Sequence, residues 1–194
     1  MTESANSSGS GGATAGQVSS RRAYTGRVIS LDVDTVRFPN GSHGDLEMVR
    51  HPGASAVVPF LTDPSSADPE LILIRQYRYA ASGYLLEVPA GRLDAGEEPL
   101  ECARRELREE TGCSADHLDY RFTMYTTPGF TDERIHVFTA TGLVRGETAH
   151  EADEFLSVET IPLSRALALI RGGEIQDAKT ALSILYAATF RSTR

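Results

Sequence analysis

Three glutamates, Glu106, Glu109 and Glu110, are spaced so that a helix would bring their carboxylates together. Glu106 and Glu110 are one turn apart on the same helix face, and Glu109 is three residues from Glu106. Two like charges about 4 Å apart repel by about 4 kcal/mol at an effective dielectric constant of about 20, so the cluster needs cations or solvent around it. Mg²⁺ or Mn²⁺ would supply the charge, since these ions take oxygen ligands and keep coordination sites open for phosphate oxygens.

A solvated helix face with salt bridges is the alternative interpretation of the same charges. Arg105 is four residues from both Glu101 and Glu109. Such pairs stabilise an exposed helix by about 0.3–0.5 kcal/mol each. Charge clustering alone leaves both interpretations open, and the flanking residues have to be considered.

The segment GRLDAGEEPLECARRELREETGC, residues 91–113, surrounds the cluster with a regular pattern. It has a glycine, a glutamate six residues later, an Arg-Glu pair, an apolar residue, a Glu-Glu pair and a glycine. This pattern resembles the signature box of the Nudix hydrolases. The one departure is Cys113, where the family usually has an aliphatic residue, and cysteine packs as a small hydrophobe.

The resemblance implies a metal site. Nudix hydrolases cleave a nucleoside diphosphate linked to another group, in an α/β/α sandwich, with divalent metal held by the helix glutamates. By this resemblance Glu106 and Glu110 are the main metal ligands and Glu109 is a further ligand, direct or through water. The backbone carbonyl of Ala90 would complete the site. The expected cofactor is Mg²⁺ or Mn²⁺.

The resemblance also implies roles for charged residues outside the metal set. Arg105 would orient a carboxylate, and Glu97 would tie the loop that precedes the helix. In similar enzymes the general base lies on a loop before the last strand. Comparison of EFLSV with the corresponding stretch favours Glu154, with Glu151 second. An acidic loop that serves only solubility is the alternative for these two residues.

Stretches on both sides of the box resemble those of ADP-sugar pyrophosphatases. Upstream, QYR (76–78) and EVPAG (87–91) match the pattern that leads into the box. Downstream, TTPGFTDER places Pro128 at a spacing after Gly112 that is similar to the ADP-ribose-hydrolysing branch. The resemblance therefore implies cleavage of ADP-ribose into AMP and ribose 5-phosphate. Predicted substrate-binding residues are Arg78, Arg50, Gly129 and Phe130.

Two other functions stay open at this point. The protein could hydrolyse another nucleoside diphosphate sugar or a dinucleotide such as NADH or diadenosine polyphosphate, because substrate pockets in this fold are built from loops. It could also be a catalytically silent sensor of a nucleotide sugar. The presence of all three glutamates of the box argues against the sensor.

Composition excludes several other classes of function. Of the 194 residues, 40% are hydrophobic and 24% charged, which is typical of a globular protein. The net charge is -8 and no stretch gathers basic residues with interleaved aromatics, so nucleic acid is not expected as a partner. No apolar run approaches the roughly 20 residues that cross a bilayer, and no signal-peptide pattern is present. We expect a cytoplasmic protein with no membrane contact and with Cys102 and Cys113 as free thiols.

The elements that must position these residues predict an α/β protein. Residues 1–20 have little to bury and are predicted to be a disordered tail. Residues 21–52 alternate apolar and polar positions around the turn PNGSHGD and predict a small antiparallel β unit. The resemblance implies that this unit forms a homodimer and reaches the partner's active site. Residues 53–194 are predicted to form the hydrolase domain.

The hydrolase domain is predicted to be an α/β/α sandwich with a mixed sheet. Pro99 suits a first helical turn and Gly112 a helix stop, with Leu100, Ala103 and Leu107 as a narrow apolar stripe between them. SRALALIRGG and QDAKTALSILYAATF predict two more helices near the end of the chain. Strands are predicted at 55–61, 70–78, 118–126, 134–143 and 155–161.

Overall fold

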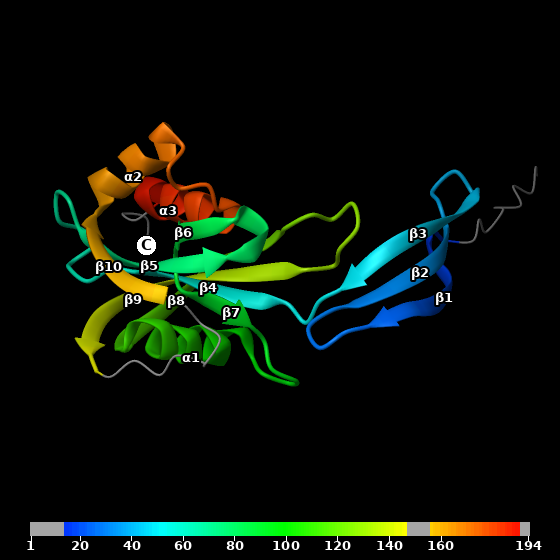
Figure 1. Ribbon diagram of the computed structural model, residues 1–194, viewed down its shortest axis with the longest axis horizontal. Helices are drawn as coiled ribbons and strands as arrows, with labels where there is room; N and C mark the ends of the chain where they lie inside the picture. Colours follow the sequence, from blue (N-terminus) through cyan, green and yellow to red (C-terminus); the bar gives the residue numbers. More distant parts are fainter. Residues whose placement is uncertain (1–13, 147–155, 191–194) are drawn as a thin grey trace, which may run out of the picture. The chain divides into compact units, whose positions relative to one another are not determined.

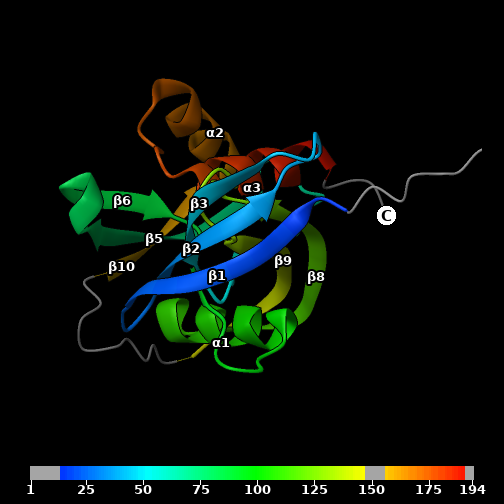
Figure 2. The ribbon, with the colours of Figure 1, turned by 90° about the vertical axis from the view of Figure 1, so that its right-hand side faces the viewer.

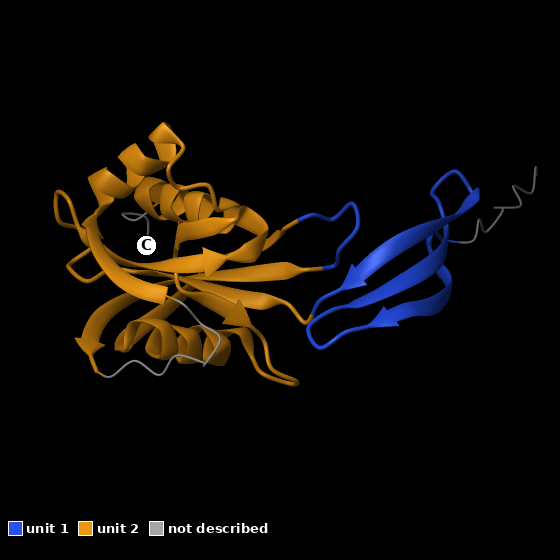
Figure 3. Ribbon diagram, in the orientation of Figure 1, with its two compact units in different colours: residues 1–51, 127–132 blue, residues 52–126, 133–194 orange. Residues whose placement is uncertain are grey.

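A computed structural model describes residues 14–146 and 156–190 of the chain (Figure 1). The candidate bases Glu151 and Glu154 lie outside the described residues. The chain divides into two compact units, coloured separately in Figure 3. Unit 1 comprises residues 1–51 and 127–132, and unit 2 comprises residues 52–126 and 133–194. Unit 1 therefore contains the loop between two strands of unit 2.

Unit 1 is a three-stranded antiparallel sheet in the order β1-β2-β3. Its strands are β1 (Gly16–Thr25), β2 (Ser30–Arg37) and β3 (His43–Arg50). Loop 127–132 adds to β3 through a parallel bridge between Val49 and Thr131. The predicted tail at 1–20 extends too far, because β1 begins at Gly16. All ten residues of β1 are exposed, so the strand is held by backbone pairing to β2, which residue composition does not reveal.

Unit 2 contains two sheets. One is mixed, in the order β7-β4-β9-β8, with β4 parallel to β9 and the other pairs antiparallel. The other is antiparallel, in the order β10-β5-β6. The strands are β4 (Ala54–Pro59), β5 (Glu70–Arg78), β6 (Gly83–Glu87), β7 (Ala90–Arg92), β8 (Cys113–Tyr125), β9 (Arg134–Arg145) and β10 (Leu156–Pro162).

Helices cover both sides of these sheets, as Figures 1 and 2 show. Helix α1 (Pro99–Thr111) lies on one side, and α2 (Leu163–Gly172) and α3 (Ala178–Phe190) lie on the other; a short 3₁₀ helix, η1 (Tyr79–Ala81), follows β5. Successive residues of β4 face opposite sides, since Val58 joins the core under α2 and α3 while Val57 joins the core under α1. The predicted α/β/α sandwich is confirmed. No helix in the described ranges 14–146 and 156–190 has the length and apolar composition to cross a membrane.

Helix α1 has the predicted bounds. Pro99 occupies its first turn, and Gly112 ends it in the left-handed conformation with φ 70°, which glycine adopts without strain. Ala103 and Leu107 are fully buried against the sheet, as predicted. Leu100, predicted as the third member of the stripe, is 37% exposed, and the neighbouring Cys102 is buried in its place. Both cysteines are free thiols, as predicted.

Candidate functional site

The polar face of α1 lies against β7. Glu106 and Glu110 are both buried, and Glu110 accepts a hydrogen bond of 2.9 Å from the backbone N–H of Ala90. Gly91 follows Ala90, and a Cβ built on it would overlap the carboxylate of Glu106. The absence of a side chain at residue 91 thus lets the helix carboxylate approach the β7 backbone. Two predicted metal ligands on α1, Glu106 and Glu110, thus lie against the backbone of residues 90–91, which includes the third predicted ligand, Ala90.

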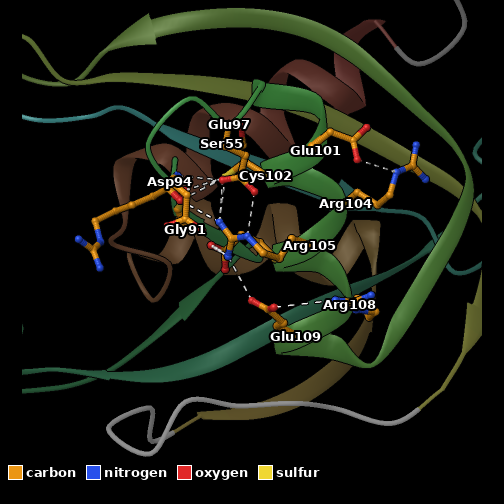
Figure 4. A network of polar contacts seen from close by, with 12 residues as sticks. Ser55, Gly91, Asp94, Glu97, Glu101, Cys102, Arg104, Arg105, Arg108 and Glu109 are labelled. Atoms are coloured by element: carbon orange, nitrogen blue, oxygen red, sulfur yellow. Dashed lines mark hydrogen bonds and ion pairs between the residues drawn. The ribbon is translucent and has the colours of Figure 1, made fainter.

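Arg105 is the centre of the polar network in Figure 4. Its guanidinium donates to both carboxylate oxygens of Glu97 at 2.9 and 3.0 Å, to Glu106 at 2.6 Å and to Glu109 at 3.1 Å. It also donates to the backbone carbonyl of Arg92 at 3.0 Å. The bonds to Glu97 are the largest cause of a raised Arg105 pKa. This arrangement accounts for the stability of three neighbouring carboxylates on one helix, because a single cation bridges two of them.

Glu97 ties the loop before α1. Its carboxylate accepts from the backbone N–H of Asp94 at 2.9 Å as well as from Arg105. The hydrogen bonds from Arg105 are the main reason that the pKa of Glu97 falls to about 2. Beneath the loop, the Cys102 thiol donates to the carbonyl oxygens of Gly91 and Arg92 at 3.5 and 3.4 Å. Burial raises the pKa of this thiol to about 11, so it stays protonated and can donate.

The donor set fits a divalent cation chemically. Within the part of the chain that the structure describes, no three His, Cys, Asp or Glu side chains are gathered into a metal-binding group. Instead Glu106 and Glu109 turn toward Arg105, as described above. Even so, carboxylate and backbone carbonyl oxygens are the kinds of ligand that Mg²⁺ and Mn²⁺ prefer. The set Ala90, Glu106, Glu109 and Glu110 therefore stays a prediction.

Arg78 lies at the end of β5 in a second network of unit 2. Its Nε and Nη2 each donate to one carboxylate oxygen of Glu87 at 2.9 Å. The hydrogen bond to Glu87 is the largest cause of a raised Arg78 pKa, and the charges of Glu110 and Asp177 add to it. The charge of Glu110, a predicted metal ligand on α1, therefore acts on this guanidinium in the same direction as that of Glu87. The Arg78 side chain is 41% exposed, so it is accessible to a substrate.

Glu87 and Lys179 are partners that the sequence analysis missed. Glu87 is 1% exposed and also accepts a hydrogen bond from Lys179 of α3. Burial opposes ionisation of Glu87, but the bonds and charges of Arg78 and Lys179 outweigh it, and the pKa lies below its usual value. One feature of the sequence could have drawn attention to Lys179, because it is the only lysine in the chain.

The other predicted substrate residues belong to unit 1. Arg50 donates to Asp32 at 3.1 Å, to Asp132 at 3.2 Å and also to Asp34. The backbone N–H of His51 donates to Asp132 at 2.9 Å, so both residues anchor loop 127–132.

Gly129 and Phe130 lie in this anchored loop. The carbonyl of Phe130 accepts from Val49 N–H at 2.7 Å, while its ring is exposed. Substrate contact by Arg50, Gly129 and Phe130 stays a prediction.

Comparison with known proteins agrees with this geometry. The family model of the NUDIX domain matches residues 51–181. The ADP-ribose pyrophosphatase of Bacillus subtilis (strain 168) is 42% identical over 171 residues, covering 87% of this chain and 90% of that protein. The methanol dehydrogenase activator of Bacillus methanolicus is 37% identical with the same coverage.

One solved structure shows the same fold. It is a crystal structure of an ADP compounds hydrolase, with a TM-score of 0.77 and 22% identity, covering 92% of this chain and 94% of that chain. The family match itself includes α1 with its glutamates and the sheet on which α1 packs. Because the match takes in two thirds of the chain and the whole helix site, the protein belongs to the Nudix family.

Proposed function

We propose that the protein hydrolyses the pyrophosphate bond of ADP-ribose, adding water to give AMP and ribose 5-phosphate. The observation that carries this proposal is that unit 2 contains both the carboxylates of α1 and an accessible arginine, Arg78, on which the charge of Glu110 acts. The first group suits a divalent cation and the second suits a phosphate oxygen. The similarity to the Bacillus subtilis ADP-ribose pyrophosphatase supports the choice of substrate.

We assign the roles within unit 2 as follows. Glu106, Glu110 and the carbonyl of Ala90 hold Mg²⁺ or Mn²⁺, with Glu109 as a further ligand. A bound divalent ion would neutralise charge on the pyrophosphate oxygens and lower the pKa of the attacking water. Arg105 keeps the glutamates oriented through the bonds described above.

Two further roles complete the assignment. Arg78 binds the diphosphate, for which its exposed guanidinium and planar donors are suited. Glu154, with Glu151 as the second candidate, accepts the proton of the water; both residues lie outside the described part of the chain. A base must come within about 3 Å of the proton it takes, or act through one water.

We further propose that the protein is a cytoplasmic homodimer. Strand β1 is an edge of the unit 1 sheet, and its exposed side chains include Val18 and Tyr24. An exposed edge strand with apolar residues favours pairing with another chain.

The proposal is tested by product analysis with purified protein. ADP-ribose, ADP-glucose, GDP-mannose, NADH and diadenosine polyphosphates are each incubated with Mg²⁺, with Mn²⁺ and with EDTA. We expect AMP and ribose 5-phosphate from ADP-ribose, faster than products from the other substrates and only with metal. Faster cleavage of another substrate would favour the related hydrolase, and nucleotide binding without cleavage would favour the sensor.

Two variants of α1 make the test specific to the carboxylate site. Glu106→Gln should lower turnover by about three orders of magnitude, since it removes a charged ligand from a metal-assisted reaction. Glu101→Gln is the matched control, because Glu101 is on the same helix but its side chain is 61% exposed and pairs loosely with Arg104. Equal activity of the two variants would refute the assignment of Glu106.

A further inference from the structure

Lys179 occupies an unusual position for a lysine. It is the only lysine among the 194 residues, it lies in the first turn of α3, and its side chain is only 14% exposed. Its ammonium group donates to Glu87 and, at 2.9 Å, to Asp177. A lysine is rarely buried unless its charge is paired, and both partners here are carboxylates. Its burial between them indicates a specific role.

Glu87 connects Lys179 to the proposed diphosphate site. This buried carboxylate accepts two bonds from Arg78 and one from Lys179, so two cations share one anion. Arg78 uses Nε and Nη2 in these bonds, and its Nη1 can donate to a phosphate. The orientation of the guanidinium is therefore set by Glu87, and the charge of Glu87 is balanced in part by Lys179.

The first turn of α3 also contacts the backbone just before Ala90, a proposed metal ligand. Asp177 accepts from the backbone N–H of Thr180 at 3.0 Å and from its hydroxyl at 2.6 Å. The Thr180 hydroxyl oxygen in turn accepts a 2.9 Å bond from the backbone N–H of Val88, which is two residues before Ala90. Thr180 is fully buried. Two side chains in the first turn of α3 thus contact the segment 87–88, one at the Glu87 carboxylate and one at the Val88 backbone.

We propose that Lys179 is a positioning residue for Arg78, acting through the carboxylate of Glu87. The proposal rests on the proposed function, in which Arg78 binds the diphosphate. Without Lys179, Glu87 would lose one of its two cationic partners, and Asp177 would lose its ammonium partner. The charge of Arg78 would then be neutralised more fully by these carboxylates, and the cluster would lose one positive charge that favours an anionic substrate.

Kinetics of Lys179 variants test this role. Lys179→Met should raise KM for ADP-ribose about tenfold, with a smaller change in kcat, because the loss affects binding of the diphosphate in both ground and transition states. Lys179→Arg keeps the charge and should recover part of the loss. Arg75→Met is the matched control: Arg75 is on the same strand as Arg78 and pairs with Glu159, but its side chain is exposed and that of Glu159 is only partly buried, so KM should not change.

A double-mutant cycle separates positioning from general stability. If Lys179 acts through Arg78, adding Lys179→Met to Arg78→Met should change KM by less than about twofold. A full tenfold effect in the Arg78→Met background would overturn the proposal. So would a Lys179→Met variant that melts at a lower temperature but has the KM of the unmodified protein.

A measurement without substrate distinguishes failure of this proposal from failure of the proposed function. With lysine labelled with ¹³C at Cε, the protein gives one side-chain NMR signal, because Lys179 is the only lysine. Arg78→Met should move this signal and Arg75→Met should not. If the signal moves but ADP-ribose is not cleaved, the contact stands and the substrate is wrong. If Arg78→Met leaves the signal in place, the link through Glu87 is absent and the proposal fails, even where Lys179→Met does not fold.

Discussion

At the scale of single residues, the site depends on how closely α1 and β7 approach. Gly91 leaves room for the Glu106 carboxylate, and Glu110 accepts a hydrogen bond from Ala90 in the adjacent position. Cys102 donates from below to the carbonyls of Gly91 and Arg92. Each contact joins the helix to the same three-residue strand. A change of one methyl group at this strand should therefore alter the proposed metal site.

Gly91→Ala tests this dependence directly. The new Cβ would overlap the Glu106 carboxylate, so that side chain must rotate away or α1 must shift. We expect turnover to fall by about a hundredfold, since displacement of a reacting or metal-binding group by about 1 Å has effects of this size. Binding of Mn²⁺, measured by calorimetry, should weaken in parallel. Gly172→Ala in α2 is the control, because its Cβ would meet no atom closer than 3.5 Å; unchanged Mn²⁺ binding in Gly91→Ala would contradict the assignment.

At the scale of elements, local signals in the sequence predicted α1 better than they predicted β1. Pro99 and Gly112 delimit α1 because helix ends impose local requirements on the backbone. Strand β1 has no such signal over Gly16–Ser20, since its hydrogen bonds go to β2 and its side chains remain exposed. Leu100 was expected inside and is partly exposed, because a stripe of three residues leaves the rotation of a helix loosely defined.

The residues of the candidate site also divide into those that local sequence predicts and those that it does not. The α1 residues could be predicted because their spacing is local. The partners of Arg50 and Glu87 could not be predicted. Asp132 is 82 residues from Arg50, and Lys179 is 92 residues from Glu87. Such pairs are set by strand pairing and helix packing, which one sequence without its fold does not reveal.

The loop-helix junction at Glu97 predicts a pH dependence of stability. Its pKa falls from 4.5 to about 2 in the folded protein, chiefly through hydrogen bonds from Arg105. A carboxylate with a lowered folded pKa contributes its full stability above the unfolded value, and this contribution is lost as the pH falls from about 4.5 to about 2. The free energy of unfolding should therefore differ between the unmodified protein and Glu97→Gln by a constant amount above about pH 5. The difference should shrink toward zero near pH 2.

This prediction is checked by urea unfolding in EDTA between pH 7 and 2.5. Glu101→Gln serves as the control, because its exposed carboxylate lies 3.8 Å from Arg104 and such pairs contribute little. Its free energy of unfolding should stay within about 0.5 kcal/mol of the unmodified protein at neutral pH. A Glu97→Gln difference that persists unchanged to pH 2.5 would show that the ion pair with Arg105 does not hold the loop.

At the scale of the whole molecule, the predicted functional residues are distributed over two units. The α1 glutamates, Ala90 and Arg78 belong to unit 2, whereas Arg50 and loop 127–132 belong to unit 1. Loop 127–132 connects β8 to β9 along the chain but belongs to unit 1, where Arg50 and His51 bind it through Asp132. Any substrate contact from Arg50 must therefore come from unit 1, either of the same chain or of a second copy. The predicted homodimer makes these two cases experimentally distinct.

Mixing two defective variants decides between them. Arg50→Gln and Glu106→Gln are each expected to be weakly active, one through substrate binding and the other through the metal site. If Arg50 serves the site of the partner chain, a mixed dimer contains one intact site and one doubly defective site. After equal amounts are unfolded and refolded together, half of the dimers are mixed, and activity should recover to about a quarter of that of the unmodified protein.

The same mixture shows no recovery if Arg50 serves its own chain, because each site of a mixed dimer then carries one defect. Light scattering on the mixture must first give about twice the 21.0 kDa mass of the chain, since a monomer would remove the predicted homodimer altogether. Arg50 also bridges Asp32 and Asp34 in unit 1, so the Arg50→Gln protein must keep its circular dichroism spectrum before mixing. Recovery with a dimer of native spectrum would place unit 1 in the active site of the partner chain.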